Sequence, residues 1–181
     1  MILSTLLLPS LLSLSTAAPA TSHYYLKTTP SEPTQPLYLS SSITYNGHTN
    51  YVLLTSASLA QPLSLFPGSG SITLDTSNVI GASSHAPLLL ADTAGWSEKY
   101  KQVVLGDVKS GEYTTGFEIG GDGVLRLGMD GFGGFVACTA AKGVKQVYWF
   151  EGGGEEGEVP VVCEEVEFVA EVALNGTVRD V

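Results

Sequence analysis

The segment LSLFPGSGSITL (residues 63–74) consists of two short apolar runs joined by a turn of proline, glycine and serine. A second segment, GFEIGGDGVLRL (residues 116–127), repeats this layout at an offset of 53 residues, from 63 to 116. Glycine supplies the positive backbone angles that tight turns need, and strands of alternating polarity flank each turn. Both segments therefore predict β-hairpins, and together they indicate an internal repeat of about 50 residues.

The same alternation extends along most of the chain. Residues 37–45 alternate between apolar and polar side chains, and Asn46-Gly47 follows as a strong hairpin turn signal. No segment combines helical apolar spacing with caps. We therefore expect an all-β fold, a single antiparallel domain of about ten to twelve strands. Three units over residues 24–66, 71–119 and 124–173 would make a β-trefoil, which we favour over a β-sandwich or another barrel.

Composition excludes several classes of protein. Of the 181 residues, 44% are hydrophobic and only 14% are charged, so the chain lacks the composition of a disordered protein. The formal net charge is −10, with 18 acidic against 8 basic residues. This excess disfavours nucleic acids and anionic membrane surfaces as partners. We expect a soluble monomer.

The N-terminus has the features of a secretory signal peptide. Residues 1–15 read MILSTLLLPSLLSLS, and TAAPA follows over residues 16–20. This apolar run is too short for a membrane span and is followed by small residues suited to cleavage, although no Lys or Arg precedes it. We expect a signal peptide over residues 1–20, a β domain over 21–175 and a tail over 176–181. The protein is then secreted, to the medium or the cell wall, and has no membrane segment after cleavage.

Two cysteines remain, Cys138 and Cys163. In an oxidising compartment an even number of cysteines indicates a disulfide, so we expect these two to be bonded. Asn175 begins an Asn-Gly-Thr sequon and is a possible glycosylation site.

No catalytic or metal site emerges from the motifs. The three histidines, His23, His48 and His85, lack metal-chelating spacing, and no Gly-x-Ser-x-Gly elbow is present. A set of Ser83, His85 and Asp92 is conceivable only through tertiary contacts. A glycosidase would need two carboxylates, and sequence alone selects no pair from the candidates Asp75, Asp92, Asp107, Glu118 and Asp122. We predict no catalytic residue, metal or cofactor.

The aromatic and acidic residues are the remaining candidates for a functional role. Trp96 lies in the loop segment Ala94–Ser97 and is the one predicted ligand-binding residue, because an exposed ring can stack on a sugar. Trp149 lies in an apolar strand and is expected in the core. The run GGGEEGE (residues 152–158) and the glutamates after it are expected to form a solvated acidic face.

The C-terminal third resembles a family. The segments FGGFVAC (residues 132–138), QVYWF (146–150) and VCEEVEFV (162–169) follow a pattern similar to small secreted proteins of filamentous fungi, of the kind that includes PhiA-like cell-wall proteins. The N-terminal YLKTT (residues 25–29) resembles the opening strand of that family. The resemblance implies a secreted β-domain with one disulfide and no assigned activity, and it carries over no catalytic residue.

Three functional hypotheses follow. The first is a non-enzymatic domain, extracellular or bound to the cell wall, whose partner is cell-wall polysaccharide. The second is a secreted hydrolase that uses two carboxylates. The third is a secreted effector or inhibitor that binds another extracellular protein through its loops.

Overall fold

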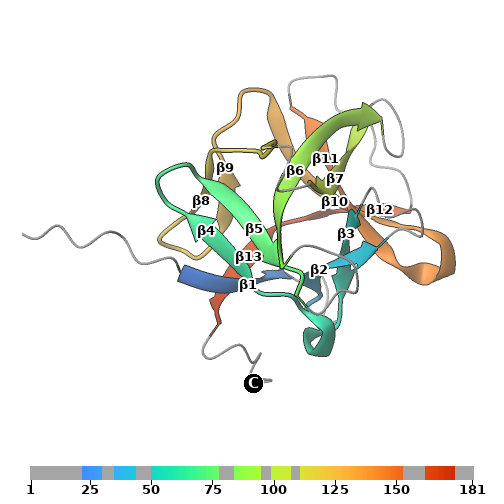
Figure 1. Ribbon diagram of the computed structural model, residues 1–181. Helices are drawn as coiled ribbons and strands as arrows, with labels where there is room; N and C mark the ends of the chain where they lie inside the picture. Colours follow the sequence, from blue (N-terminus) through green and yellow to red (C-terminus); the bar gives the residue numbers. More distant parts are fainter. Residues whose placement is uncertain are drawn as a thin grey trace, which may run out of the picture.

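The computed structural model describes residues 22–29, 35–43, 50–77, 84–94, 99–106, 111–152 and 162–173 (Figure 1). These residues form thirteen β-strands and two 3₁₀ turns, η1 (Ala57–Leu59) and η3 (Ala141–Gly143), and no α-helix. None of them belongs to a helix with the length and apolarity needed to cross a bilayer. The strands are β1 (Ser22–Thr28), β2 (Tyr38–Ile43), β3 (Asn50–Thr55), β4 (Leu63–Phe66), β5 (Ser71–Asp75), β6 (His85–Ala94), β7 (Tyr100–Leu105), β8 (Phe117–Ile119), β9 (Leu125–Leu127), β10 (Phe132–Thr139), β11 (Lys145–Glu151), β12 (Cys163–Val166) and β13 (Phe168–Val172).

Alternating polarity explains why these segments are strands with one buried face. In β5, Ile72 and Leu74 are fully buried while Thr73 between them is partly exposed. In β9, Leu125 and Leu127 are buried while Arg126 between them faces solvent. Successive side chains of a strand point to opposite faces, so this period of two places one face of each strand on the core.

Six strands follow one another around a ring. β1 pairs with β13 and β4, β4 pairs with β5, and β8 pairs with β9, all antiparallel. The ring continues from β9 to β13 through a bridge between Val124 and Val169, and from the β4–β5 turn to β8 through a hydrogen bond from the Phe117 N–H to the Gly70 carbonyl. The two segments of the sequence repeat, β4–β5 and β8–β9, are therefore neighbouring hairpins of this ring (Figure 1).

A glycine makes the joint between these two hairpins possible. Gly70 has φ = +63°, and a Cβ at this position would lie 2.8 Å from the Gly116 nitrogen. A side chain would both strain the backbone and separate the strands, so the glycine turn of residues 63–74 fixes the ring as well as its own hairpin.

Three further hairpins meet one another at one end of this ring. They are β2–β3, β6–β7 and β10–β11. β3 pairs with β7, β7 pairs with β11, and β11 pairs with β3, so the three hairpins form a triangle of contacts. Each predicted unit, residues 24–66, 71–119 and 124–173, thus contributes strands to the ring and one hairpin to the triangle.

The expected all-β antiparallel fold is confirmed, and the number of strands is one above the expected range. Residues 163–172 contribute two of these strands, β12 and β13, which one residue separates. The chain leaves strand geometry at Glu167, so β12 pairs with β10 while β13 pairs with β1.

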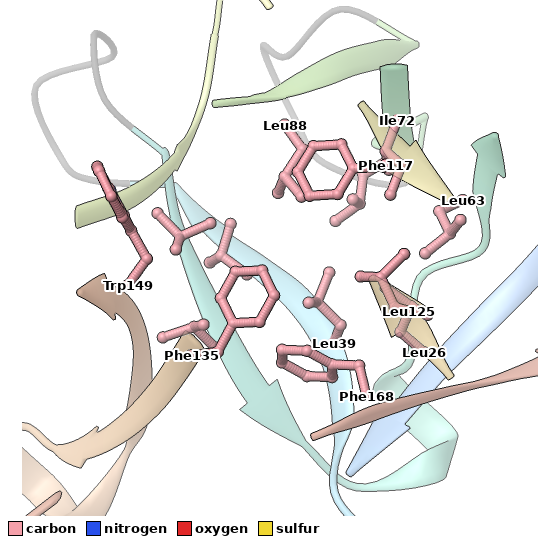
Figure 2. Close-up of a cluster of buried hydrophobic side chains, with 14 of the residues drawn as sticks. Leu26, Leu39, Leu63, Ile72, Leu88, Phe117, Leu125, Phe135, Trp149 and Phe168 are labelled. Atoms are coloured by element: carbon pink, nitrogen blue, oxygen red, sulfur yellow. The ribbon is translucent and has the colours of Figure 1, made fainter. Parts of the chain in front are cut away.

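The core is assembled from nearly every strand. Figure 2 shows its side chains converging, and the ten labelled residues come from ten different strands: Leu26, Leu39, Leu63, Ile72, Leu88, Phe117, Leu125, Phe135, Trp149 and Phe168. Trp149, expected in the core, is 5% exposed, and its indole N–H donates a hydrogen bond to the Ala91 carbonyl. Because all three units contribute side chains to this core, the ring of strands packs against the triangle of hairpins.

Candidate functional site

A groove of about 650 Å³ opens beside the β8–β9 hairpin and the β12–β13 bend. This volume lies within the range of small-molecule sites. We call it the aromatic groove, and it is lined by Thr29, Val124, Leu125, Arg126, Leu127, Phe132, Gly133, Gly134, Phe135, Phe150, Glu165, Val166, Glu167 and Phe168.

The Phe-Gly-Gly-Phe segment builds one wall of the aromatic groove. The pairing of β10 with β11 shifts register between Phe132 and Gly134, which places a bulge at Gly133. A Cβ on Gly133 would lie 2.6 Å from the Phe150 ring and 2.7 Å from the Gly152 nitrogen. Glycine at this position therefore lets the Phe150 ring lie directly against the backbone of β10, where it lines the groove.

Four rings in edge and stacked contacts support this wall. Phe135 meets Phe132 edge to face, with centroids 5.0 Å apart, and meets Phe168 in the same way at 5.3 Å. Phe132 also stacks on Trp149 at 6.5 Å. Phe135 and Phe168 are buried in the core (Figure 2), whereas Phe132 is only partly buried. Phe150 is also partly buried and packs on Tyr100. Part of an ordered aromatic layer is thus open to a ligand.

A fixed ion pair borders the β9 side of the groove. Arg126 donates to both carboxylate oxygens of Asp122, at 2.9 and 2.5 Å. These bonds, with one from the Val124 N–H, hold the pKa of Asp122 well below its usual range. Asp122 therefore stays ionised and neutralises the guanidinium locally.

Two further carboxylates, those of Glu165 and Glu167, line the groove, and the charge of Glu167 acts on Arg126. Glu165 and Glu167 are exposed, and neither forms an ion pair within the described part of the chain. The Glu167 carbonyl accepts a hydrogen bond from the Thr29 N–H, which fixes the bend between β12 and β13. Burial and the nearby charge of Glu165 raise the pKa of Tyr100. The groove therefore combines apolar ring faces with two available carboxylates.

The disulfide anchors this carboxylate wall. Cys138 of β10 is bonded to Cys163 of β12, as expected, and the two residues are direct partners in the strand pairing. Glu165 and Glu167 follow Cys163 closely along the chain. The covalent link thus sets the position of one wall relative to the aromatic wall on β10.

Comparison with protein families gives one match. The model of a family described as a domain of unknown function (DUF7907) matches residues 21–172, well over half of the chain. The chain belongs to this family. No curated protein matches it, and no solved structure does. The expected lack of an assigned activity agrees with the family description.

The single residues that the sequence suggested as functional do not define the site of this DUF7907 domain. Trp96, Asn175, His48, Ser83 and Asp107 lie outside the residues that the structure describes. Asp92 pairs with Lys101, at 2.5 Å, and neither residue lines the groove. Asp122 borders the groove only through Arg126. Among the described residues, no three His, Cys, Asp or Glu side chains are grouped so that they could hold a metal ion.

A separate polar cluster joins β1, β4, β5 and β6. His23 Nδ1 lies 3.0 Å from Ser64 Oγ, and Asp75 is opposite His85 in the pairing of β5 with β6. Partial burial raises the pKa of Asp75, but the hydrogen bonds from Ser77 and the charges of His85 and His23 outweigh it, so that the pKa is lowered. Two histidines far apart in sequence thus act on the charge of one carboxylate, which their spacing in the sequence did not predict.

A second groove, of about 610 Å³, lies near η1 and η3. Its lining includes Ser40, whose hydroxyl donates to the Leu59 carbonyl, and the exposed side chains of Leu59 and Val144. It holds one charged side chain, Lys145, and no aromatic ring. The aromatic groove therefore has the richer ligand chemistry of the two.

The residues of the aromatic groove were missed as a site because they are spread along the chain. Phe132 and Phe150 belong to segments that the sequence singled out for family resemblance, and Glu165 and Glu167 were assigned to a solvated acidic face. Gly133 and Gly134 were the available signal of the groove, because paired glycines inside a strand mark a bulge or a close approach of another backbone or ring.

Proposed function

We propose that this protein is a secreted, non-enzymatic β domain that binds glycan in the aromatic groove. One observation carries the proposal: partly exposed Phe132 and Phe150 share a groove with the available carboxylates Glu165 and Glu167. The C–H-rich face of a sugar ring packs on flat aromatic surface, while carboxylate oxygens accept hydrogen bonds from sugar hydroxyls. A few placed polar groups in an apolar site are typical of ligand pockets.

The setting of this function is part of the same proposal. The disulfide supports an oxidising, extracellular location, and residues 1–20 would direct the chain there. We propose cell-wall polysaccharide as the partner and a fungal source, on the resemblance to PhiA-like proteins. We also propose that the ring and the triangle of hairpins form a β-trefoil, because each of the three units contributes equivalent strands to both.

Carboxylate-based hydrolysis is less well supported. A glycosidase places its two carboxyl groups on either side of the scissile bond. Glu165 and Glu167 are two residues apart on the same wall, and the carboxylate nearest the other wall, Asp122, is held by Arg126. The described residues thus favour binding over cleavage.

A pull-down on insoluble chitin and β-glucan tests the proposal. We expect the protein to bind at least one polymer and Phe132→Leu to weaken binding about tenfold, because leucine keeps the apolar volume but removes the flat face. Phe66→Leu is the matched control, since Phe66 is 40% exposed on β4 and does not line the groove. Absence of binding to both polymers, or equal weakening by both variants, would refute the proposal.

A further inference from the structure

We infer that the aromatic groove selects glycans that carry free amino groups, so that its preferred ligand is a polymer of glucosamine rather than a neutral or acidic polysaccharide. This inference rests on the proposed glycan function and names the substrate class. It follows from the charges that border the groove and from their state of pairing.

The cationic side of the groove offers no free positive charge. Arg126 is its one basic lining residue, and both oxygens of the Asp122 carboxylate accept hydrogen bonds from it. A sulfate, phosphate or uronate on a ligand would have to displace Asp122 from Arg126. The site is therefore poorly suited to an anionic glycan, and the chain's net charge of −10 adds a repulsion at longer range.

Two negative charges, those of Glu165 and Glu167, also line the groove, and the charge of Glu167 is near enough to Arg126 to help raise the pKa of that guanidinium. Glu165 and Glu167 lie two residues apart at the bend between β12 and β13, and both line the groove. Three of the described lysines are paired with other carboxylates: Lys27 with Glu171, Lys101 with Asp92 and Glu151, and Lys145 with Glu164. Neither Glu165 nor Glu167 forms a salt bridge with these lysines, so Glu165, and Glu167 beside the paired Arg126, can accept a cationic group of a ligand.

The lining of the groove combines the two kinds of contact that an amino sugar makes. The rings of Phe132 and Phe150 offer surface for a pyranose face, and the carboxylates lie across the same groove. An amine on the ring is a cationic donor, so it gains a charge-assisted hydrogen bond where a hydroxyl or an acetamide gains only a neutral one. Charge complementarity on an aromatic site therefore distinguishes glucosamine from N-acetylglucosamine and from glucose.

The test compares three soluble oligosaccharides of equal length at pH 6: fully deacetylated glucosamine oligomers, N-acetylglucosamine oligomers and β-glucan oligomers. Titration calorimetry at low and at high salt gives the affinity of each. We expect the glucosamine oligomer to bind about tenfold more tightly than the other two at low salt, since two exposed charge pairs supply this order of preference. The preference should fall toward unity at high salt.

Substitutions of the glutamates show which residues cause the preference for the glucosamine oligomer. The double change Glu165→Gln with Glu167→Gln should remove the preference for the glucosamine oligomer while leaving weak binding of the neutral oligomers. The control pair is Glu164→Gln with Asp130→Asn, which removes the same charge from exposed residues that do not line the groove.

Two results would overturn the inference, and they are distinguishable. If the neutral oligomers bind as tightly as the glucosamine oligomer, or if the control pair removes the preference equally, the choice of amino sugars is wrong while glycan binding stands. If none of the three oligomers binds, the proposed function itself fails, and the inference fails with it.

Discussion

Gly133 is the residue on which the shape of the aromatic groove depends most directly. A methyl group there would meet the Phe150 ring at 2.6 Å and the backbone nitrogen of Gly152 at 2.7 Å. The ring could rotate away, but the backbone of β11 could not without breaking the pairing of the two strands. Overpacking of this kind costs about 1–3 kcal/mol.

Gly133→Ala should therefore lower the free energy of unfolding by about 1–3 kcal/mol, measured by chemical denaturation, and should also weaken ligand binding. Gly121→Ala is the matched control, because a Cβ at Gly121 has no atom within 4 Å and its φ is not in the left-handed region. Equal midpoints for the two variants would show that the Phe150 contact is not what demands glycine.

Asp75 should give the fold an acid-sensitive contribution. Its pKa is lowered in the folded state, so the ionised carboxylate stabilises the fold above the unfolded pKa of about 3.9, and this stabilisation is lost as the pH falls through the lower native pKa. Asp75→Asn should be less stable than the wild type at pH 6, and the difference should shrink as the pH approaches 3.

Denaturant unfolding between pH 3 and pH 6 measures this difference. Asp130→Asn, at an exposed turn outside the polar cluster, is the comparison. A difference between Asp75→Asn and the wild type that stays constant over this range would contradict the linkage to the Asp75 carboxyl.

Among the elements, β12 depends most on a single bond. It has four residues, pairs with β10, and shares its first residue with the disulfide. Replacing both cysteines by alanine should lower the free energy of unfolding by about 3 kcal/mol, because the unfolded chain regains the entropy of an open loop. Chemical denaturation with and without reducing agent measures this loss.

The reduced wild type should match the double alanine variant, and amide exchange should be faster in β12 than in β4–β5 in both. Uniform loss of protection along the whole chain would instead show that the bond holds the entire fold rather than one wall of the groove.

Lys101 connects three strands through two ion pairs and a cation–π contact. It extends from β7 to Asp92 of β6 and Glu151 of β11, each at 2.5 Å, and lies 5.0 Å from the centroid of the Trp149 ring. Lys101→Gln should destabilise the protein slightly at low salt and change the Trp149 fluorescence, while the stability difference should vanish at high salt. A salt-independent difference would assign the effect to packing of the lysine stem.

For the whole molecule, strand positions and turn types were predictable from sequence because they depend on local periodicity. Residues 63–74 and 116–127 contain their own turns, and their alternation fixes the buried face. The separation of β12 from β13 was not predictable from local periodicity. β12 pairs with β10 of the C-terminal third, whereas β13 pairs with the N-terminal strand β1. The site was missed for the same reason, since Phe132, Phe150 and Glu167 meet only in the folded chain.

Secretion is a prediction for the whole molecule as well. Mass spectrometry of the protein recovered from the culture medium should show loss of about 17–20 N-terminal residues and a mass lower by two hydrogens, because the Cys138–Cys163 bond forms. Far-UV circular dichroism of the same sample should show strand without helix. Recovery of a chain that retains Met1 would contradict the predicted export.

The disulfide between β10 and β12 also determines where the chain can be lengthened. Its sulfur atoms tie Cys163, where the connection from β11 returns to β12, to Cys138 of β10. A peptide tag or a guest sequence grafted into this connection would be fastened at its base whatever its length. The molecule thereby offers a display scaffold in which one end of the inserted segment is tied covalently to the body of the protein.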